Sequence, residues 1–283
     1  MSTPPAAVAT LIASSRLYKP AVALDFFKHG GKAERIPAGE TIFAEGKKGL
    51  IFRDKMYLLI SGDVELMMRK KVITTLKAGE IFGELAAIDG APRTASAVAK
   101  TNCRVIGLDE KQFYAALRKK PGFALMLMSV MINRLRDTIT RLLANGDMSE
   151  KEATKESVTF KPKLLEELVQ GLADDPPVFF LQGKQIMQAG QTGLRMYAIV
   201  EGRVTVTIGG RVVERLGPGG VFGEAALVDQ STRLASAVAE SDCSLLAISR
   251  QAFMALVKIS PEFADAILGT LAERMRFLAA RLQ

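Results

Sequence analysis

One stretch of this 283-residue chain occurs twice. The first copy spans residues 82–96 and reads FGELAAIDGAPRTAS, and the second spans residues 222–236 and reads FGEAALVDQSTRLAS. The offset is 140 residues, from 82 to 222, and in each copy an arginine follows nine residues after a glutamate. Each copy predicts a glycine turn, a short helix of small apolar residues, a tight turn and an arginine entering a strand. We therefore expect the chain to fold as two similar units.

The residue types in this stretch suit a ligand that carries a phosphate and a sugar. Free N–H groups at the beginning of a helix favour an anion, and an arginine can neutralise a phosphate with paired hydrogen bonds. A carboxylate at the same helix end can accept a hydrogen bond from a ribose hydroxyl. Gly83 and Gly223 have no Cβ, so the backbone can approach a ligand closely. The sequence predicts a cradle for phosphate and ribose, present twice.

The pattern Phe-Gly-Glu-x-Ala, with Arg nine residues after the Glu and then x-Ala-Ser, closely resembles the phosphate-binding cassette of cyclic-nucleotide-binding domains. That family includes kinase regulatory subunits, cyclic-nucleotide-gated channels and bacterial catabolite activator proteins. The resemblance implies that Glu84 and Glu224 bind the ribose 2′-hydroxyl, and that Arg93 and Arg233 bind the cyclic phosphate. It also implies phosphate contacts from six backbone amides, those of Leu85, Ala86, Ala95, Ala225, Ala226 and Ala235. The alternative is a roll that keeps this turn without binding a nucleotide.

The two copies differ in the residues predicted to meet the base. The first has Thr94 after its arginine, whose hydroxyl can reach the phosphate or the exocyclic amine of a guanine, whereas the second has Leu234, which can do neither. By resemblance, the Arg-Thr-Ala-Ser form occurs in domains that accept cyclic GMP as well as cyclic AMP. Thr138 falls where catabolite activator proteins place a threonine on adenine, and the second copy has Leu278 there; the alternative for Thr138 is an exposed helix residue. We expect the first pocket to be the more polar.

Short strand patterns separated by glycine turns surround each copy. In the first half we expect strands at residues 33–36, 41–43, 56–60, 64–68, 72–76, 96–99 and 103–108. This spacing is typical of an antiparallel β-roll or jelly roll. A capping box at Asp109 and Gln112 then predicts a helix, and residues 121–144 carry apolar side chains at helical spacing. The predicted fold is α+β and mainly β, with two jelly-roll-like β-rolls, each flanked by entry helices and a long closing helix.

Glycines and strand patterns recur over the whole unit. Before Tyr57 the offset between the halves is 144 residues and after it 140, so the first half carries four extra residues ahead of Tyr57. A polar stretch separates the halves. We therefore predict an N-terminal tail, a first nucleotide-binding domain, a linker and a second nucleotide-binding domain, at residues 1–16, 17–144, 145–158 and 159–283.

Composition excludes several classes of chemistry. Cys103 and Cys243 are 140 residues apart, in equivalent places, which favours two small buried residues over a disulfide. With His29 as the only histidine, these cysteines cannot build a structural zinc site or a four-cysteine iron–sulfur cluster. His29 is expected on the surface or at a helix end. No Ser–His or Cys–His pairing is recognisable, so we predict no catalytic residues, no metal, no cofactor and no enzyme activity.

The chain lacks an apolar run long enough to span a bilayer, and its first residues lack a basic signal region, so a cytoplasmic protein is expected. Positive charge gathers in the first half: residues 1–144 carry 23 Lys and Arg against 13 Asp and Glu, and residues 145–283 carry 15 against 17. Two explanations of this positive charge remain: the residues cover a solvated surface, or they bind an acidic partner.

Two hypotheses about function follow. The first is a receptor for cyclic AMP or cyclic GMP that signals by conformational change to an unidentified protein effector, with a homodimer through the long helices as a possible assembly. The second is a protein that binds nucleic acid or a membrane surface, with cassettes that are relict or that bind a cyclic dinucleotide. The first is the prediction. Nucleic acid is disfavoured as a partner, and a membrane surface is the weaker alternative.

Overall fold

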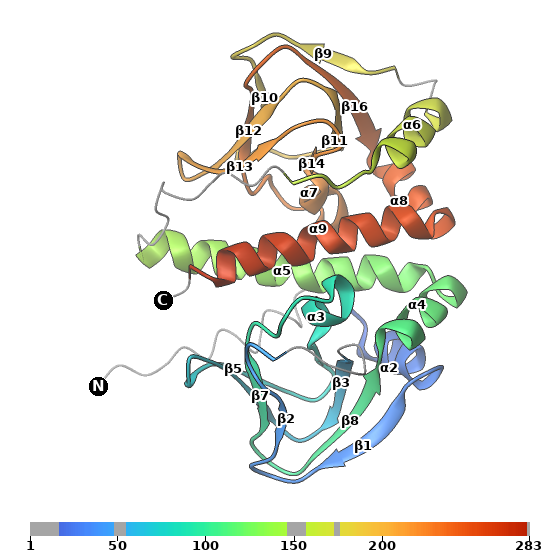
Figure 1. Ribbon diagram of the computed structural model, residues 1–283, viewed down its shortest axis with the longest axis vertical. Helices are drawn as coiled ribbons and strands as arrows, with labels where there is room; N and C mark the ends of the chain where they lie inside the picture. The colour runs from blue at the N-terminus through green and yellow to red at the C-terminus, as the bar shows by residue number, and fades with distance from the viewer. Residues whose placement is uncertain (1–16, 48–54, 146–156, 173–175, 282–283) are drawn as a thin grey trace. The chain divides into compact units, whose positions relative to one another are not determined.

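The computed structural model describes residues 17–47, 55–145, 157–172 and 176–281 (Figure 1). The chain divides into two compact units, Met1–Arg134 and Leu135–Gln283. Each unit contains two four-stranded antiparallel sheets with helices before and after them, so the predicted fold class is confirmed. The predicted tail, and most of the predicted linker, lie outside the described residues.

Helix α2 (Pro20–Lys28) precedes the strands of the first unit, and Pro20 lies in its first turn. His29 is exposed at its C-terminal end, as expected. Strands β1, β8, β3 and β6 form one sheet in that order, and β2, β7, β4 and β5 form the other. Their bounds are β1 (Lys32–Ile36), β2 (Thr41–Phe43), β3 (Met56–Ser61), β4 (Val64–Met68), β5 (Lys71–Leu76), β6 (Ile81–Phe82), β7 (Ser96–Ala99) and β8 (Cys103–Leu108).

The second unit repeats this topology. Helix α6 (Pro162–Gly171) precedes the strands. Its sheets have the orders β14-β11-β16-β9 and β10-β15-β12-β13. The bounds are β9 (Val178–Phe180), β10 (Gln185–Met187), β11 (Arg195–Glu201), β12 (Val204–Ile208), β13 (Arg211–Leu216), β14 (Val221–Phe222), β15 (Ser236–Ala239) and β16 (Cys243–Ser249).

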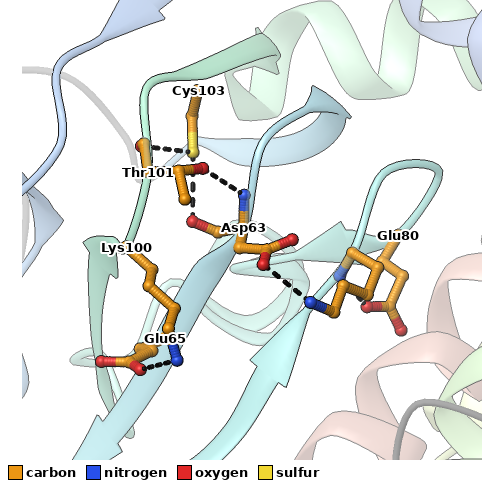
Figure 2. A network of polar contacts seen from close by, with 7 residues as sticks. Asp63, Glu65, Glu80, Lys100, Thr101 and Cys103 are labelled. Carbon is orange, nitrogen blue, oxygen red and sulfur yellow. Dashed lines mark hydrogen bonds and ion pairs between the residues drawn. The ribbon is translucent and has the colours of Figure 1, made fainter.

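The two cysteines brace equivalent turns between strands. Cys103 Sγ donates to the carbonyl oxygens of Asp63 and Thr101, while Thr101 Oγ1 accepts from the Asp63 amide (Figure 2). The turn needs glycine at 62, where φ is 90° and a Cβ would lie 2.5 Å from the Asn102 carbonyl oxygen. Cys103 and Cys243 are free and buried, which confirms the prediction that they form no disulfide.

Two helices close each unit. The predicted capping box at Asp109 and Gln112 begins α4 (Glu110–Lys119), and α5 (Gly122–Asn145) follows. Their counterparts in the second unit are α8 (Arg250–Ile259) and α9 (Pro261–Ala279). The predicted first domain, residues 17–144, contained all of α5 but its last residue, whereas the units divide between Arg134 and Leu135, inside this helix.

The cassettes lie over the hydrophobic core of each unit. In the first, the rings of Tyr57 and Phe82 stack with centroids 5.3 Å apart, and Tyr57 and Phe82 belong to one buried cluster. In the second, Tyr197 and Phe222 stack at the same distance. Because Phe82 and Phe222 are buried in these pairs, the backbone of the next residue, a glycine, is held in place. In the described part of the chain no helix is long and apolar enough to cross a membrane.

Candidate functional site

Each cassette begins with a glycine that packs against the cassette arginine. Gly83 (φ 73°) precedes α3 (Glu84–Asp89), and Gly223 (φ 84°) precedes α7 (Glu224–Asp229). A Cβ at 83 would lie 2.7 Å from Nη1 of Arg93, and a Cβ at 223 would lie 2.5 Å from Nη1 of Arg233. Two features therefore require glycine at each position: the backbone is left-handed, and the arginine side chain leaves no room for a Cβ.

The two arginines are buried and held by backbone carbonyl groups. Arg93 donates to the carbonyl oxygens of Gly83 and Lys55, at 2.8 Å each, and lies over the ring of Phe43. Arg233 donates to those of Gly223 at 2.7 Å and Arg195 at 2.5 Å. These bonds orient each guanidinium group, but neutral carbonyls do not neutralise its charge.

Arg233 forms no ion pair with any carboxylate of the described residues. Burial lowers the pKa of its guanidinium, although Tyr197 and Glu224 act in the opposite direction. A buried cation without a counter-charge is costly, and an anion that reaches it removes that cost. The environment of Arg233 therefore suits an anionic ligand.

The two cassette glutamates are each 3% exposed, and each is paired with an arginine of a closing helix. Arg134 Nη1 donates to Glu84 Oε1 at 2.6 Å, and Arg274 Nη1 donates to Glu224 Oε1 at 2.9 Å. Glu224 Oε2 is buried and accepts no hydrogen bond from the described residues. A hydroxyl donor in the cavity would satisfy this oxygen.

Arg134 and Arg274 were missed by sequence reasoning. They anchor the closing helices further, since Arg134 also donates to the carbonyl oxygen of Ile81 at 2.5 Å and Arg274 to that of Val221 at 2.6 Å. Their positions are 140 residues apart, which is the offset of the cassettes. The signal that could have found them is an arginine at the same place in both closing helices.

A cavity of about 410 Å³ lies in the second unit against the cassette. Cavities of roughly 300–1,000 Å³ with mainly apolar walls and a few convergent polar groups are typical of small-molecule sites. The predicted residues of the second cassette all line it. They are Gly223, Glu224, Ala225, Ala226, Arg233, Leu234 and Ala235. Leu278 also lines the cavity, as do Arg274 and Phe277 of α9.

Helix α5 contributes to this second site. Leu135 and Ile139 line the cavity, and Arg136 holds the end of α7, with Nε 2.6 Å from Asp229 Oδ2. Arg136 Nη2 also donates to the carbonyl oxygen of Thr232, directly before Arg233. These contacts agree with the division of the chain, in which residues from Leu135 onward belong to the second unit.

In the first unit the structure brings Gly83, Glu84 and Arg93 together, and Thr94 follows Arg93 half-buried. Thr138 is half-buried on the part of α5 that belongs to the second unit, so its predicted role at the first base stays a prediction. The other predicted first-site residues, Leu85, Ala86 and Ala95, lie within the cassette. Among the described residues, no group of three or more His, Cys, Asp or Glu side chains is arranged to hold a metal ion.

Comparison with known families identifies the class of protein that this fold and these cassettes define. The sequence model of the cyclic nucleotide-binding domain matches the chain twice, at residues 33–120 and 177–260. The chain belongs to the cyclic nucleotide-binding domain family and carries the domain in tandem, so the predicted family is confirmed.

A curated relative is the CRP-like cAMP-activated global transcriptional regulator of Mycobacterium tuberculosis, which is 33% identical over 111 residues. The match covers 38% of this chain and 48% of that protein, so the chain spans about half the length of the curated relatives it matches. A solved structure of the regulatory domain of Toxoplasma gondii PKA with cAMP is similar at 20% identity and a TM-score of 0.31, covering 90% of this chain and 95% of that chain. Thermus thermophilus catabolite activator protein is similar at 22% identity and a TM-score of 0.36, covering 48% and 72%.

Proposed function

We propose that this chain is a receptor for cyclic nucleotides, with one binding site in each unit, and that it acts by binding rather than by catalysis. One observation carries the proposal. In the second unit a buried arginine, Arg233, and a buried carboxylate oxygen of Glu224 line the same cavity, and the described residues supply neither a carboxylate to the first nor a donor to the second. A cyclic phosphate supplies the anion, and the adjacent ribose hydroxyl supplies the donor.

The proposed roles in the first unit follow from the same contacts. Arg93 is buried, and its guanidinium is oriented by the backbone, while Glu84 is fixed by Arg134. We assign the cyclic phosphate to Arg93 and the ribose hydroxyl to Glu84. Membership of the family supports this assignment, since both cassettes lie inside the matched residues.

The two sites are proposed to prefer different bases. Apolar side chains of Leu234 and Leu278 line the second cavity, so the base there is held by apolar contact. Thr94 gives the first site a hydroxyl in the equivalent place. Cyclic AMP is the proposed ligand of the second site, and the first accepts cyclic GMP as well. The Mycobacterium tuberculosis relative, described as cAMP-activated, supports cyclic AMP as a ligand.

Signalling is proposed to run through the closing helices. Arg134 on α5 and Arg274 on α9 are bonded to the glutamates that would meet the ribose. A ligand that bonds to Glu84 or Glu224 changes the partners of these arginines and so favours one position of each helix. The helix faces that move are the proposed contact for a protein effector or for a second copy of the chain.

Replacing either cassette arginine tests the proposal. We expect Arg93→Ala and Arg233→Ala each to cost about 2–5 kcal/mol of binding at its own site, because each leaves a buried phosphate without its partner. Isothermal titration calorimetry with cyclic AMP, cyclic GMP and a cyclic dinucleotide measures the loss. Arg104→Ala is the matched control, since Arg104 is exposed on β8 and outside the cassette.

The parent chain should also melt at a higher temperature in the presence of a cyclic nucleotide. If the chain binds no cyclic nucleotide and instead binds polyanions with steep salt dependence, the receptor proposal is wrong. Binding to nucleic acid or to a membrane surface is then the better function. If both arginine variants lose less than about tenfold in affinity, or about 1.4 kcal/mol, the assignment of the cyclic phosphate to these arginines is wrong.

A further inference from the structure

Glu214 places a second carboxylate on the wall of the second cavity. It lies on β13, its side chain is 12% exposed, and its Oε2 atom is 3.0 Å from both Nε and Nη2 of Arg274. Arg274 also donates to Glu224 and to the carbonyl oxygen of Val221. The guanidinium group of Arg274 therefore bonds to two carboxylates and a carbonyl group. The two carboxylates neutralise its charge, so it attracts an anionic ligand weakly.

The charges of the cavity wall balance. Among the described residues that line it, three are acidic and three are basic, namely Glu214, Glu224, Glu273, Arg233, Arg274 and Arg276. Burial opposes the charge of Arg274, but the carboxylates of Glu214 and Glu224 outweigh burial and hold the pKa of Arg274 above its ordinary value. Arg274 thus stays charged, and Glu214 and Glu224 neutralise that charge.

The first unit has no acid at this place. Its equivalent residue is Thr74, which lies opposite Leu66 in the β4–β5 ladder, as Glu214 lies opposite Val206 in the β12–β13 ladder. Arg134 donates to Glu84 and to the Ile81 carbonyl oxygen with a threonine at this place, so these two contacts do not require a carboxylate there.

A different acid, Glu80, lies near Arg134 in the first unit, on the turn before β6. Its carboxylate accepts from the Lys77 amide at 2.5 Å. Burial raises the pKa of Glu80, although Lys77 and Arg134 act against this. Glu80 thus lies on a turn and accepts from the backbone, whereas Glu214 lies on a strand and accepts from Arg274.

The hairpin turns of the two units differ in charge as well. In the first unit the β4–β5 hairpin turns through Arg69 and Lys70, both with positive φ, where the second unit has Gly209 and Gly210. The Arg69 amide donates to Glu45 Oε2, and the next residue, Gly46, donates its amide to the Arg93 carbonyl oxygen. These two hydrogen bonds connect the backbone of the basic hairpin to the first cassette, and glycine adopts the same conformation at lower cost.

We infer that Glu214 sets the affinity of the second site for anionic ligands, by occupying Arg274 and adding a negative charge to the cavity wall. The second site then binds a cyclic nucleotide more weakly than the first, and the two sites fill at different concentrations of one ligand. The role given to Glu214 rests on the proposed function and specifies how the second site differs from the first.

The test measures one site at a time in the full chain. In the Arg93→Ala background, which leaves the second site intact, Glu214→Thr introduces the residue of the first unit. We expect about tenfold tighter binding of cyclic AMP by calorimetry, because a negative charge is removed from a site of low dielectric. Adenosine has the same base and ribose but no phosphate, so its affinity should not rise.

A reciprocal variant and a control complete the design. In the Arg233→Ala background, Thr74→Glu should weaken binding of cyclic AMP at the first site about tenfold. Glu240→Gln removes a charge from the exposed surface of the second unit and should change nothing. If Glu214→Thr fails to fold, as judged by circular dichroism and melting, Glu214→Gln keeps the side-chain shape and is held to the same expectation.

The outcomes separate cleanly. Unchanged or weaker binding of cyclic AMP by the Glu214 variants overturns the role of Glu214, and so does an equal gain for adenosine. Failure of the Arg93→Ala chain to bind any cyclic nucleotide before Glu214 is changed overturns the proposed function of the second site itself.

Discussion

Gly193 lies against the guanidinium group of Arg233. A Cβ at this position would be 2.4 Å from both Cζ and Nε of Arg233, which is closer than atoms in contact can lie. The neighbouring backbone surrounds the same arginine, since the Gly190 amide donates to the Arg233 carbonyl oxygen and the Arg233 amide to that of Gln191. This loop and the cassette glycine, Gly223, therefore both limit the position of Arg233.

We expect Gly193→Ala to lower the affinity of the second site about tenfold or more, because Arg233 has to move away from its two carbonyl partners. Calorimetry in the Arg93→Ala background measures this loss. Gly269→Ala is the matched control: Gly269 lies within α9 with open space around it, so the same methyl group should stabilise the fold by about 0.5–1 kcal/mol and leave affinity unchanged. Equal affinity in both variants would contradict the role of Gly193.

At the scale of elements, the segments that lead into α2 and α6 are attached differently. The Tyr18 hydroxyl donates to the Gly79 carbonyl oxygen, in the turn between β5 and β6. In the second unit the backbone amides of Thr159 and Phe160 donate to the equivalent carbonyl oxygen, that of Gly219. The first attachment depends on an ionisable side chain, whereas the second does not, so only the first is sensitive to alkaline pH.

Tyr18 makes this sensitivity measurable. Burial raises the pKa of Tyr18 to about 12, with Glu80 acting in the same direction and Arg134 against it. The folded state keeps the phenol protonated where the unfolded chain, with a pKa of 10.0, has lost the proton. The contribution of Tyr18 to the free energy of unfolding is therefore complete below pH 10 and is lost as the pH rises through 12.

The variant Tyr18→Phe should be less stable than the parent at neutral pH, by about 1 kcal/mol for the lost hydrogen bond. Between pH 10 and 12 the difference should shrink, because the parent alone loses stability through this group. Urea unfolding of both chains across this range is the measurement. A difference that stays constant with pH would show that Tyr18 does not ionise differently in the two states.

At the scale of the whole molecule, the chain contains two compact units, each with its own pair of sheets and its own cassette. Units with separate cores are expected to unfold in separate cooperative steps. Differential scanning calorimetry should therefore resolve two transitions. A ligand at one hundred times its Kd stabilises the unit that binds it by about 2.7 kcal/mol.

Cyclic AMP should thus move both transitions in the parent chain. With Arg93→Ala we expect one shift to remain and the other to disappear, and with Arg233→Ala the reverse. A single transition that moves as one in every variant would mean that the two units unfold together and that the binding energy is shared between them. The predicted homodimer through the closing helices is tested in the same samples by analytical ultracentrifugation, and it stays a prediction until then.

Local patterns in the chain were sufficient for much of this architecture. Gly83 and Gly223 marked left-handed turns, and the Asp109–Gln112 capping box marked the beginning of α4, because such signals depend on neighbours a few residues away. The equivalent positions of Cys103 and Cys243 implied two buried thiols. Duplication strengthened each of these inferences, since every signal occurred in two places.

Contacts between distant segments were not predictable in this way. No local pattern connects Arg274 to Glu214 and Glu224, which are 60 and 50 residues away, or Arg136 to Asp229, which is 93 residues away. Nor does any pattern divide α5 between two units, because the periodicity of its apolar residues continues across Arg134 and Leu135. These features depend on which helix faces the cassette after folding.

The sequence by itself determined that two cyclic-nucleotide-binding domains follow one another and which residues make up each cassette, because turns, caps and spacing act over short distances along the backbone. Only the tertiary structure decided what neutralises each buried charge: Arg233 receives no acid from the described residues, while Arg274 receives two. The reason is that the energy of a buried charge depends on its distance from other charges in space, and those distances exist only once the helices have closed over the rolls.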